Sequence, residues 1–375
     1  MDGRPEGEIK EDTLFSRDDA DARVILRKCP YCDGKELIRK GQRVKKYGEA
    51  QLYYCKNCDR KFTPGIDKHR TFPLRLIIDA ITLYNRLYSL EDSVKIVSSK
   101  YGISVTRQTL MAWLEDYREY LPFLRMREYV EKKYKPKEML EEIRLFHGQI
   151  YDFKYHRAKT NILLEESFKH HCFRPLQEFL ELVLAECPHQ VFKESQKRAS
   201  EYRDIFNLDT VRIIPKMNTA QKNTRFVTQA VLNNKLRHQI LQEFMLINDS
   251  VTVAVEVPVL LDWEDVNHFR HQLNFDVPIQ LAENEIITGH IDILQIRNGM
   301  IHIMDYKPSA KKEKPVEQLM IYALALSRLT GLRLYHFKCA WFDEEDYFEF
   351  FPLHVVYKKR KKQNAGPKNV TARFL

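Results

Sequence analysis

The stretch GHIDILQIRNGMIHIMDYKP, residues 289–308, predicts two β-strands joined by a tight turn. Asn298 and Gly299 form the strongest short-range hairpin signal, because both central positions of a type I′ turn need a positive φ. With the turn fixed there, the pairing runs outward until Asp292 stands opposite Asp305. The sequence therefore predicts a hairpin that brings two negative charges together.

Such a pairing needs a compensating charge. Directly opposed residues have Cβ atoms about 4.5–5.5 Å apart, and like charges at that separation destabilise a sheet. Side chains alternate between faces, so Lys307 shares the face of Asp305 and lies opposite His290. Two carboxylates and a lysine then converge on one side of the hairpin, where a divalent cation is the natural occupant.

Length, composition and charge limit which kinds of protein this chain can be. The chain has 375 residues with 44% hydrophobic and 11% aromatic content, enough for two or three domains with real cores. A formal net charge of +9 favours a polyanionic partner. The longest apolar run, VTVAVEVPVLL from Val251, is too short for a membrane span, and the charged start is no signal peptide. We therefore expect a cytoplasmic, nucleoid-associated protein without membrane contact.

Four of the seven cysteines form two CxxC pairs separated by 22 residues. In a reducing compartment this spacing favours metal over disulfides. Residues 23–66 are therefore predicted to form a zinc ribbon in which Zn²⁺ is structural, since the protein fills all four positions. The predicted ligands are Cys29, Cys32, Cys55 and Cys58.

Residues 67–118 contain three amphipathic runs that predict short helices. A glycine-containing turn at Gly102 between the second and third helices is typical of a helix-turn-helix. The third helix would then place Thr106, Arg107 and Gln108 at the major groove of DNA. The alternative is an ordinary three-helix packing unit.

CPYC, CKNC and SLEDSVKIVSSKYGISVTRQTLMAWL follow one another within residues 23–118. This order resembles the N-terminal DNA-binding part of insertion-sequence transposases. The resemblance implies a DNA-binding module at this end of the chain. It does not extend further, because the downstream sequence shows no set of strand-borne acids like the three carboxylates of those transposases.

Three other segments are assigned from composition. Residues 119–210 are charged and helix-prone, and are predicted to form a helical linker domain. Residues 1–22 are predicted to be a flexible tail, and residues 358–375 a basic tail. The KKRKK run in the basic tail is usually solvated, although it could also contact phosphates.

Residues 211–357 show a helix pattern, a strand, the hairpin, a second helix and a last strand, which predicts a mixed sheet flanked by helices. Over residues 225–345 the motifs VAVEVPV, GHID, MDYKP and QLMIYALAL occur in this order. They resemble the PD-(D/E)xK nuclease superfamily and, within it, the RecB-like exonucleases. The predicted fold class is multidomain α/β, with a restriction-endonuclease-like mixed β-sheet at the C-terminal end.

The resemblance assigns roles residue by residue. Asp292 and Asp305 match the metal-binding acids, and Lys307 matches the lysine of the D-x-K element. His238 matches an additional histidine ligand, although a lone histidine on a helix is as often a surface residue. The remaining candidates are the first-strand acid and the two residues of the QxxxY motif, namely Glu256, Gln318 and Tyr322.

The sequence departs from the family at two places. Gly289 and His290 stand where the family has a proline before the first acid. No trio of C-terminal cysteines follows, so we expect no iron–sulfur cluster.

Hydrolysis of a phosphodiester needs a cation that neutralises the scissile phosphate and activates a water molecule. Two carboxylates are suitable ligands for Mg²⁺ or Mn²⁺ in that role. Lys307 can orient that water. The sequence therefore predicts a DNA endo- or exonuclease of a mobile element or of a defence or repair system. The resemblance implies a helicase, recombinase or transposition partner. The alternatives are a non-catalytic DNA-binding regulator and a transposase-related protein.

Overall fold

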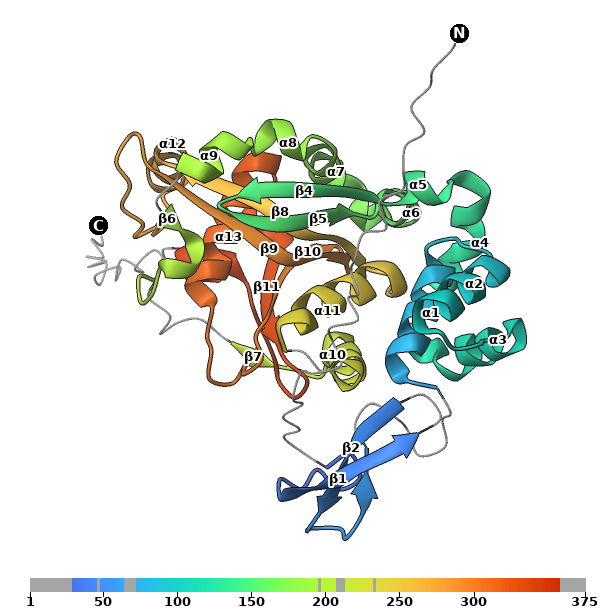
Figure 1. The fold of residues 1–375 in the computed structure, drawn as a ribbon. Helices are drawn as coiled ribbons and strands as arrows, with labels where there is room; N and C mark the ends of the chain where they lie inside the picture. Colours follow the sequence, from blue (N-terminus) through green and yellow to red (C-terminus); the bar gives the residue numbers. More distant parts are fainter. Residues whose placement is uncertain are drawn as a thin grey trace, which may run out of the picture.

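The computed structural model combines a small N-terminal sheet, a group of helices and a large mixed sheet (Figure 1). None of the helices in the described part of the chain is long and apolar enough to cross a membrane. The tails predicted at residues 1–22 and 358–375 lie outside the described residues. The structure describes residues 29–45, 48–63, 72–194, 197–206, 213–231 and 234–357.

The small sheet is antiparallel and contains β1 (Leu37–Lys45), β2 (Gly48–Cys55) and β3 (Lys61–Phe62). Its apolar core is little more than Tyr53 stacked on Phe62, with ring centroids 6.0 Å apart. A unit with so little buried apolar surface needs a further source of stability, such as a bound metal.

The three helices predicted after the ribbon are present as α1 (Leu74–Asn85), α2 (Leu90–Tyr101) and α3 (Arg107–Asp116). The side chain of Ser89 caps the start of α2 by accepting a backbone N–H bond. Gly102 ends α2 with φ 62°, a left-handed conformation that glycine adopts without strain. The turn between α2 and α3 is therefore explained by local sequence.

The large sheet has nine strands among the described residues. Strands β10 and β11 are parallel, whereas β8, β9 and β10 pair antiparallel in sequence order. The short strand β6 pairs with β9 outside the main path. In spatial order the path runs β4 (Glu141–His147), β5 (Gln149–Tyr155), β8 (Thr252–Asp262), β9 (Ile286–Arg297), β10 (Met300–Tyr306), β11 (Phe337–Phe342), β12 (Tyr347–Phe350) and β7 (Ile214–Pro215), with β6 at Lys197–Arg198.

Residues 119–210 differ from the helical linker that we predicted. Strands β4 and β5 lie in this segment and extend the large sheet, because Lys154 and Tyr155 pair with β8. Leu145, Phe153 and Tyr155 are fully buried in the core of that sheet. The helices of the segment are α4 (Leu124–Lys133), α5 (Pro136–Met139), α6 (Arg157–Glu166), α7 (Arg174–Glu181), α8 (Val183–Glu186) and α9 (His189–Glu194).

The helix pattern before β8 forms two helices, α10 (Thr219–Ala230) and α11 (Asn234–Asn248), rather than one. Val231 follows α10 in an extended conformation. After the hairpin, α13 (Val316–Thr330) starts behind a proline and ends at a glycine, as the sequence predicts. The remaining helices are α12 (Trp263–Asn267) and α14 (Pro352–Val356).

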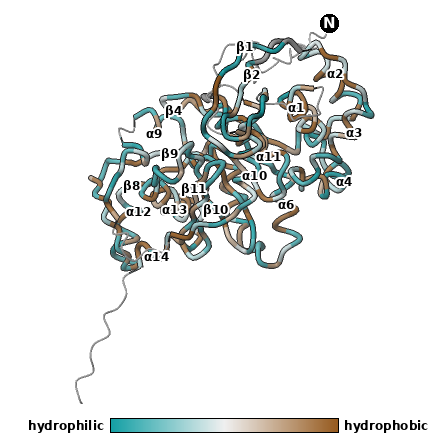
Figure 2. Tube along the Cα trace, turned by 90° about the horizontal axis from the view of Figure 1, so that it is seen from below, coloured by the Kyte–Doolittle hydropathy of each residue, from teal (hydrophilic) through white to brown (hydrophobic). Residues whose placement is uncertain are grey.

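Helices cover both faces of the large sheet. On β10, Ile301 and Ile303 pack into a core shared with α13, while Met304 and Tyr306 pack into a core shared with α10 and α11. This second core also contains residues of α1, α2 and α3. Figure 2 shows α1 beside α11 from below, consistent with their direct packing. The three N-terminal helices therefore share a hydrophobic core with the large sheet.

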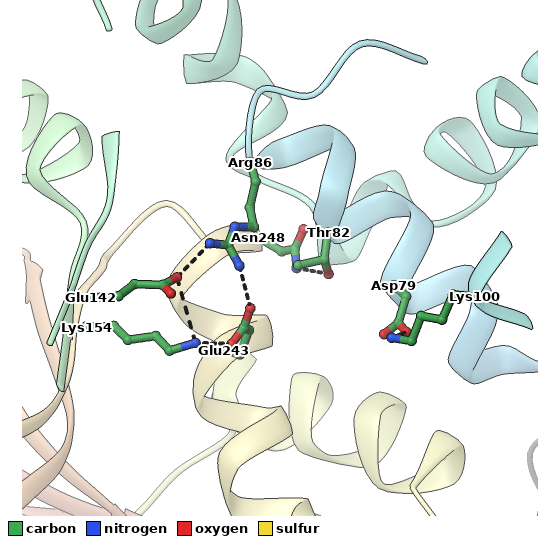
Figure 3. Close-up of polar contacts among 8 residues, drawn as sticks. All are labelled: Asp79, Thr82, Arg86, Lys100, Glu142, Lys154, Glu243 and Asn248. Carbon is green, nitrogen blue, oxygen red and sulfur yellow. Dashed lines mark hydrogen bonds and ion pairs between the residues drawn. The ribbon is translucent and has the colours of Figure 1, made fainter. Parts of the chain in front are cut away.

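Polar contacts join α1 to α11 and to the β4–β5 hairpin (Figure 3). Arg86, at the end of α1, contacts Glu142 at 2.6 Å and Glu243 of α11 at 3.2 Å. Lys154 of β5 donates to Glu243. We call Arg86, Glu142, Lys154 and Glu243 the paired cluster, because two bases face two acids.

Candidate active site

The hairpin turn fixes the register of β9 and β10. Asn298 and Gly299 have φ values of 54° and 73°, as a type I′ turn requires. The paired positions continue to Met304 opposite Ile293, so the next position brings Asp305 opposite Asp292. The predicted register is confirmed as far as the structure pairs the two strands.

The two aspartates lie side by side and are buried, with 9% and 2% of Asp292 and Asp305 exposed. One Asp292 oxygen accepts the backbone N–H of Tyr306 at 3.2 Å, and Lys307 Nζ lies 3.0 Å from Asp305 Oδ2. Burial, and then the charge of Asp292, raise the pKa of Asp305 well above its ordinary value. Ionisation of Asp305 beside Asp292 is therefore unfavourable unless a further positive charge offsets it.

Helix α11 brings two further polar side chains to Asp292. His238 Nε2 lies 2.9 Å from Asp292 Oδ2, and the histidine side chain is 39% exposed. Gln242, one turn later, donates to Glu256 Oε1 at 2.7 Å and to the Asp292 carbonyl oxygen at 3.1 Å. His238 thus stands at the site instead of on an unrelated surface, and Gln242 links Glu256 on β8 to β9.

The electrostatics of these groups follow from their proximity. Burial, and then the charge of Asp292, raise the pKa of Glu256 to about 7. Burial would lower the pKa of His238, but Asp292 outweighs that effect and raises it to about 9. Burial would raise the pKa of Asp292, yet His238 above all holds it below its ordinary value. The raised pKa values of Glu256 and His238 therefore report the negative charge of Asp292, and the lowered pKa of Asp292 reports the positive charge of His238.

We call the set Glu256, Asp292, Asp305, His238 and Lys307 the acid-rich cluster, because three acids face two bases. A ring nitrogen of His238 and one oxygen each of Glu256 and Asp292 lie within 4.8 Å of one another. Carboxylate oxygens with one imidazole suit Mg²⁺ or Mn²⁺. The cluster therefore fits a divalent cation, with Asp305 beside it.

The backbone of β8 is distorted at Glu256. This residue has φ 51°, although its neighbours continue the ladder with Val255 opposite Ile293 and Val257 opposite Ile291. A non-glycine residue in the left-handed region costs of the order of 1–3 kcal/mol and persists where the surrounding structure holds it. Here the distortion holds the Glu256 carboxyl next to Asp292.

A cavity of about 290 Å³ opens beside the acid-rich cluster and is lined by His238, Glu256 and Asp292. Gln318 and Tyr322 of α13 also line it, and Gln318 donates to the Tyr322 hydroxyl at 2.8 Å. Both residues of the QxxxY motif thus line the cavity beside the acid-rich cluster.

Gly289, where the family has proline, is explained by the same helix. A Cβ atom at this position would collide with the ring of Tyr322. A glycine there lets the tyrosine ring lie directly against the backbone of β9.

The four cysteines of the small sheet converge as predicted. Cys29 and Cys58 have Sγ atoms 3.6 Å apart, as do Cys32 and Cys55, and all four sulfurs lie within 4.8 Å. Ligands at about 2.3 Å in tetrahedral geometry are separated by about 3.8 Å, so these spacings fit one zinc ion. The cysteine cluster is therefore compatible with a zinc ribbon.

The three residues predicted at the DNA groove lie at the exposed start of α3. Thr106 is the helix cap, and its hydroxyl accepts the Thr109 N–H at 3.2 Å. Arg107 forms an exposed ion pair with Glu91 at 2.9 Å. Gln108 is exposed as well, so Arg107 and Gln108 are the side chains that can face a partner.

A family model for the PD-(D/E)XK nuclease superfamily matches residues 176–361, which contain the hairpin, the acid-rich cluster and the flanking helices α11 and α13. These residues form a PD-(D/E)XK nuclease domain. Neither the curated proteins nor the solved structures gave a match. Members of this superfamily are generally metal-dependent nucleases, and the matched segment begins before the boundary at residue 211 that we predicted.

Sequence reasoning missed several residues of the nuclease site. Gln242 follows His238 by four positions, a spacing that places both on one helix face and could have revealed it. His147, Tyr151 and Arg198 line the cavity but come from the segment that we predicted to be a helical linker. Their role at the site depends on pairing of distant strands, for which no local signal exists.

Proposed function

We propose that the chain is a divalent-metal-dependent DNA nuclease of the RecB-like branch. The observation that carries this proposal is the acid-rich cluster, in which three buried or half-buried acids face only two bases beside an open cavity. Such an imbalance is costly in a folded core unless a cation offsets it.

His238, Glu256, Asp292 and Asp305 would hold Mg²⁺ or Mn²⁺. When bound, the cation neutralises charge on the scissile phosphate and lowers the pKa of a water molecule. Lys307, held beside Asp305, orients the attacking water and balances charge as the phosphate becomes more negative.

The N-terminal part of the chain supplies DNA binding in this proposal. The cluster of four cysteines would hold a structural zinc ion, and α3 would present Arg107 and Gln108 to DNA. Because these helices share a hydrophobic core with the large sheet, DNA bound by them would lie on the same unit as the nuclease site.

The test is cleavage of labelled linear and circular DNA by the purified full-length protein, with Mg²⁺, with Mn²⁺ or without added metal. We expect cleavage only with metal, and none from Asp292→Asn. Asp204→Asn, which alters an exposed acid outside the site, is the matched control and should cleave like the wild type. Wild-type protein that cuts neither DNA with either metal would contradict the proposal.

A further inference from the structure

The cavity continues from the acid-rich cluster toward a second wall of different chemistry. His147 and Tyr151 of the β4–β5 hairpin, Phe192 of α9, and Arg198 and Ser200 line this wall. His147 and Tyr151 precede the segment matched by the nuclease family model, and the sequence motifs include none of the five. The wall is therefore a feature of this chain beyond the metal-binding motifs.

Two ring stacks hold the wall rigid. Tyr151 lies parallel to His290, with centroids 3.6 Å apart and an interplanar angle of 8°. His147 stacks on Phe192 at 3.8 Å, and its Nδ1 is 2.9 Å from His290 Nε2. His290 covers one face of the Tyr151 ring, so a flat ligand would have to stack on the opposite face.

Two polar groups of the wall are left for a ligand. Arg198 lies in β6, paired with β9 at Thr288, and no carboxylate in the described ranges lies within ion-pair distance of its guanidinium. The side chain of His147 is buried, with 2% of the residue exposed, yet its Nε2 has no hydrogen-bond partner among the described residues. A cation and a ring nitrogen are therefore available.

Size and charge limit what can bind. A cavity of about 290 Å³ lies at the lower end of the range of about 300–1,000 Å³ for small-molecule sites. Its lining includes the acids Glu256 and Asp292 as well as Arg198. A base that is paired and stacked in a duplex cannot enter such a space, whereas an unpaired one can.

We propose that His147, Tyr151 and Arg198 form a nucleotide subsite, which binds one unpaired nucleotide next to the scissile phosphate. The base stacks on Tyr151, an edge of the base reaches His147, and the neighbouring phosphate lies at Arg198. This inference rests on the proposed function, because it places the scissile phosphate at the acid-rich cluster. It makes single-stranded or frayed DNA the preferred substrate over intact duplex.

The experiment measures fluorescence anisotropy of the full-length protein with a labelled single strand and with the same strand in a blunt duplex, without added Mg²⁺ or Mn²⁺. Loss of an aromatic stacking partner costs about 1–3 kcal/mol per base, so Tyr151→Leu should weaken single-strand binding about tenfold. Arg198→Gln should weaken it by a similar factor. Both variants should leave duplex binding within about twofold, since that binding depends on backbone contacts made elsewhere.

Two variants serve as matched controls. Tyr151→Phe keeps the ring, and Arg174→Gln removes an exposed arginine that does not line the cavity, so both should bind the single strand like the wild type. If Tyr151→Leu lowers the melting temperature, Arg198→Gln alone decides the outcome. Single-strand binding unchanged by Arg198→Gln would overturn the subsite.

Cleavage separates this inference from the proposed function. Wild-type protein that binds single strands through Arg198 but cuts no DNA with Mg²⁺ or Mn²⁺ would support the subsite and contradict the nuclease. A metal-dependent nuclease whose single-strand affinity is indifferent to both substitutions would overturn the subsite alone.

Discussion

Helix α11 contributes to two ionic clusters of opposite character. Glu243 belongs to the paired cluster, where two acids face Arg86 and Lys154. His238, on the same helix, belongs to the acid-rich cluster, where three acids face two bases. In the paired cluster the numbers of acids and bases are equal, whereas the acid-rich cluster has one acid more than it has bases.

The difference in charge balance suggests that the paired cluster serves stability and the acid-rich cluster serves function. A buried charge without a partner is destabilising, so evolution of a stable core alone would favour the balanced arrangement. The paired cluster meets that requirement and fixes α1 against α11 (Figure 3). The acid-rich cluster does not balance its acids with bases, and it lies beside an open cavity, which is where a functional site is expected.

The largest effect should follow from Asp305→Asn. We expect cleavage to fall by more than about 10³-fold, because the substitution removes a charge worth several kcal/mol to the bound cation. The metal-free fold should become slightly more stable, since one of two repelling carboxyl groups is gone. Cleavage rate and melting temperature measure the two effects. An Asp305→Asn variant that cuts DNA at the wild-type rate would contradict a functional role for the acid-rich cluster.

The opposite pattern is expected from Glu243→Ala in the paired cluster. Removing Glu243 leaves the buried Lys154 with only the more exposed Glu142, 3.9 Å away, and costs about 3–5 kcal/mol of stability. The folded protein should still cleave DNA, because Glu243 does not line the cavity. Urea unfolding measures the loss, and the double variant Lys154→Met with Glu243→Leu should recover part of it. A loss below about 1 kcal/mol would contradict the structural role.

Cys58→Ser extends the comparison to the cluster of four cysteines. The small sheet has little core of its own, so opening its cysteine cluster should release about one zinc ion per chain and unfold this part. The nuclease domain should retain its melting transition. Zinc analysis measures the release of zinc, and calorimetry measures the melting transition. Wild-type protein that contains no zinc would contradict the predicted zinc ribbon.

The smallest effect on stability is expected from Arg107→Ala. Its ion pair with Glu91 is exposed on both sides, and such pairs contribute about 0–1 kcal/mol. If α3 reads DNA, the substitution should instead reduce discrimination among sequences by about 1–3 kcal/mol at the contacted base. Binding assays on a sequence library measure this. An equal loss on every sequence would identify a phosphate contact.

The hairpin was predictable because its determinants are local. Asn298 and Gly299 specify the turn, and the period of two then places Asp292 against Asp305. The cysteine spacing and the Gly102 turn are local signals of the same kind. Gln318 and Tyr322 were found through the family resemblance, and the structure places both at the cavity.

The β4–β5 hairpin was missed for an identifiable reason. Gly148, with φ 74°, turns the chain between β4, whose buried residues Leu145 and His147 alternate near the turn, and β5, which shows no such alternation. The segment has many charged residues and is flanked by helices in the sequence, so its overall pattern favoured a helical prediction. Its place at the edge of the large sheet depends on pairing with β8, more than ninety residues later, which local sequence does not encode.

The most direct test of the central claim is titration of the zinc-loaded protein with Mn²⁺, followed by calorimetry. We expect Mn²⁺ to bind the wild type and raise the melting temperature of the nuclease domain, because a ligand that binds only the folded state stabilises it. Asp292→Asn should lose both effects, and Glu243→Gln, in the paired cluster, should keep the binding. Absence of Mn²⁺ binding, or binding that survives in Asp292→Asn, would contradict the account.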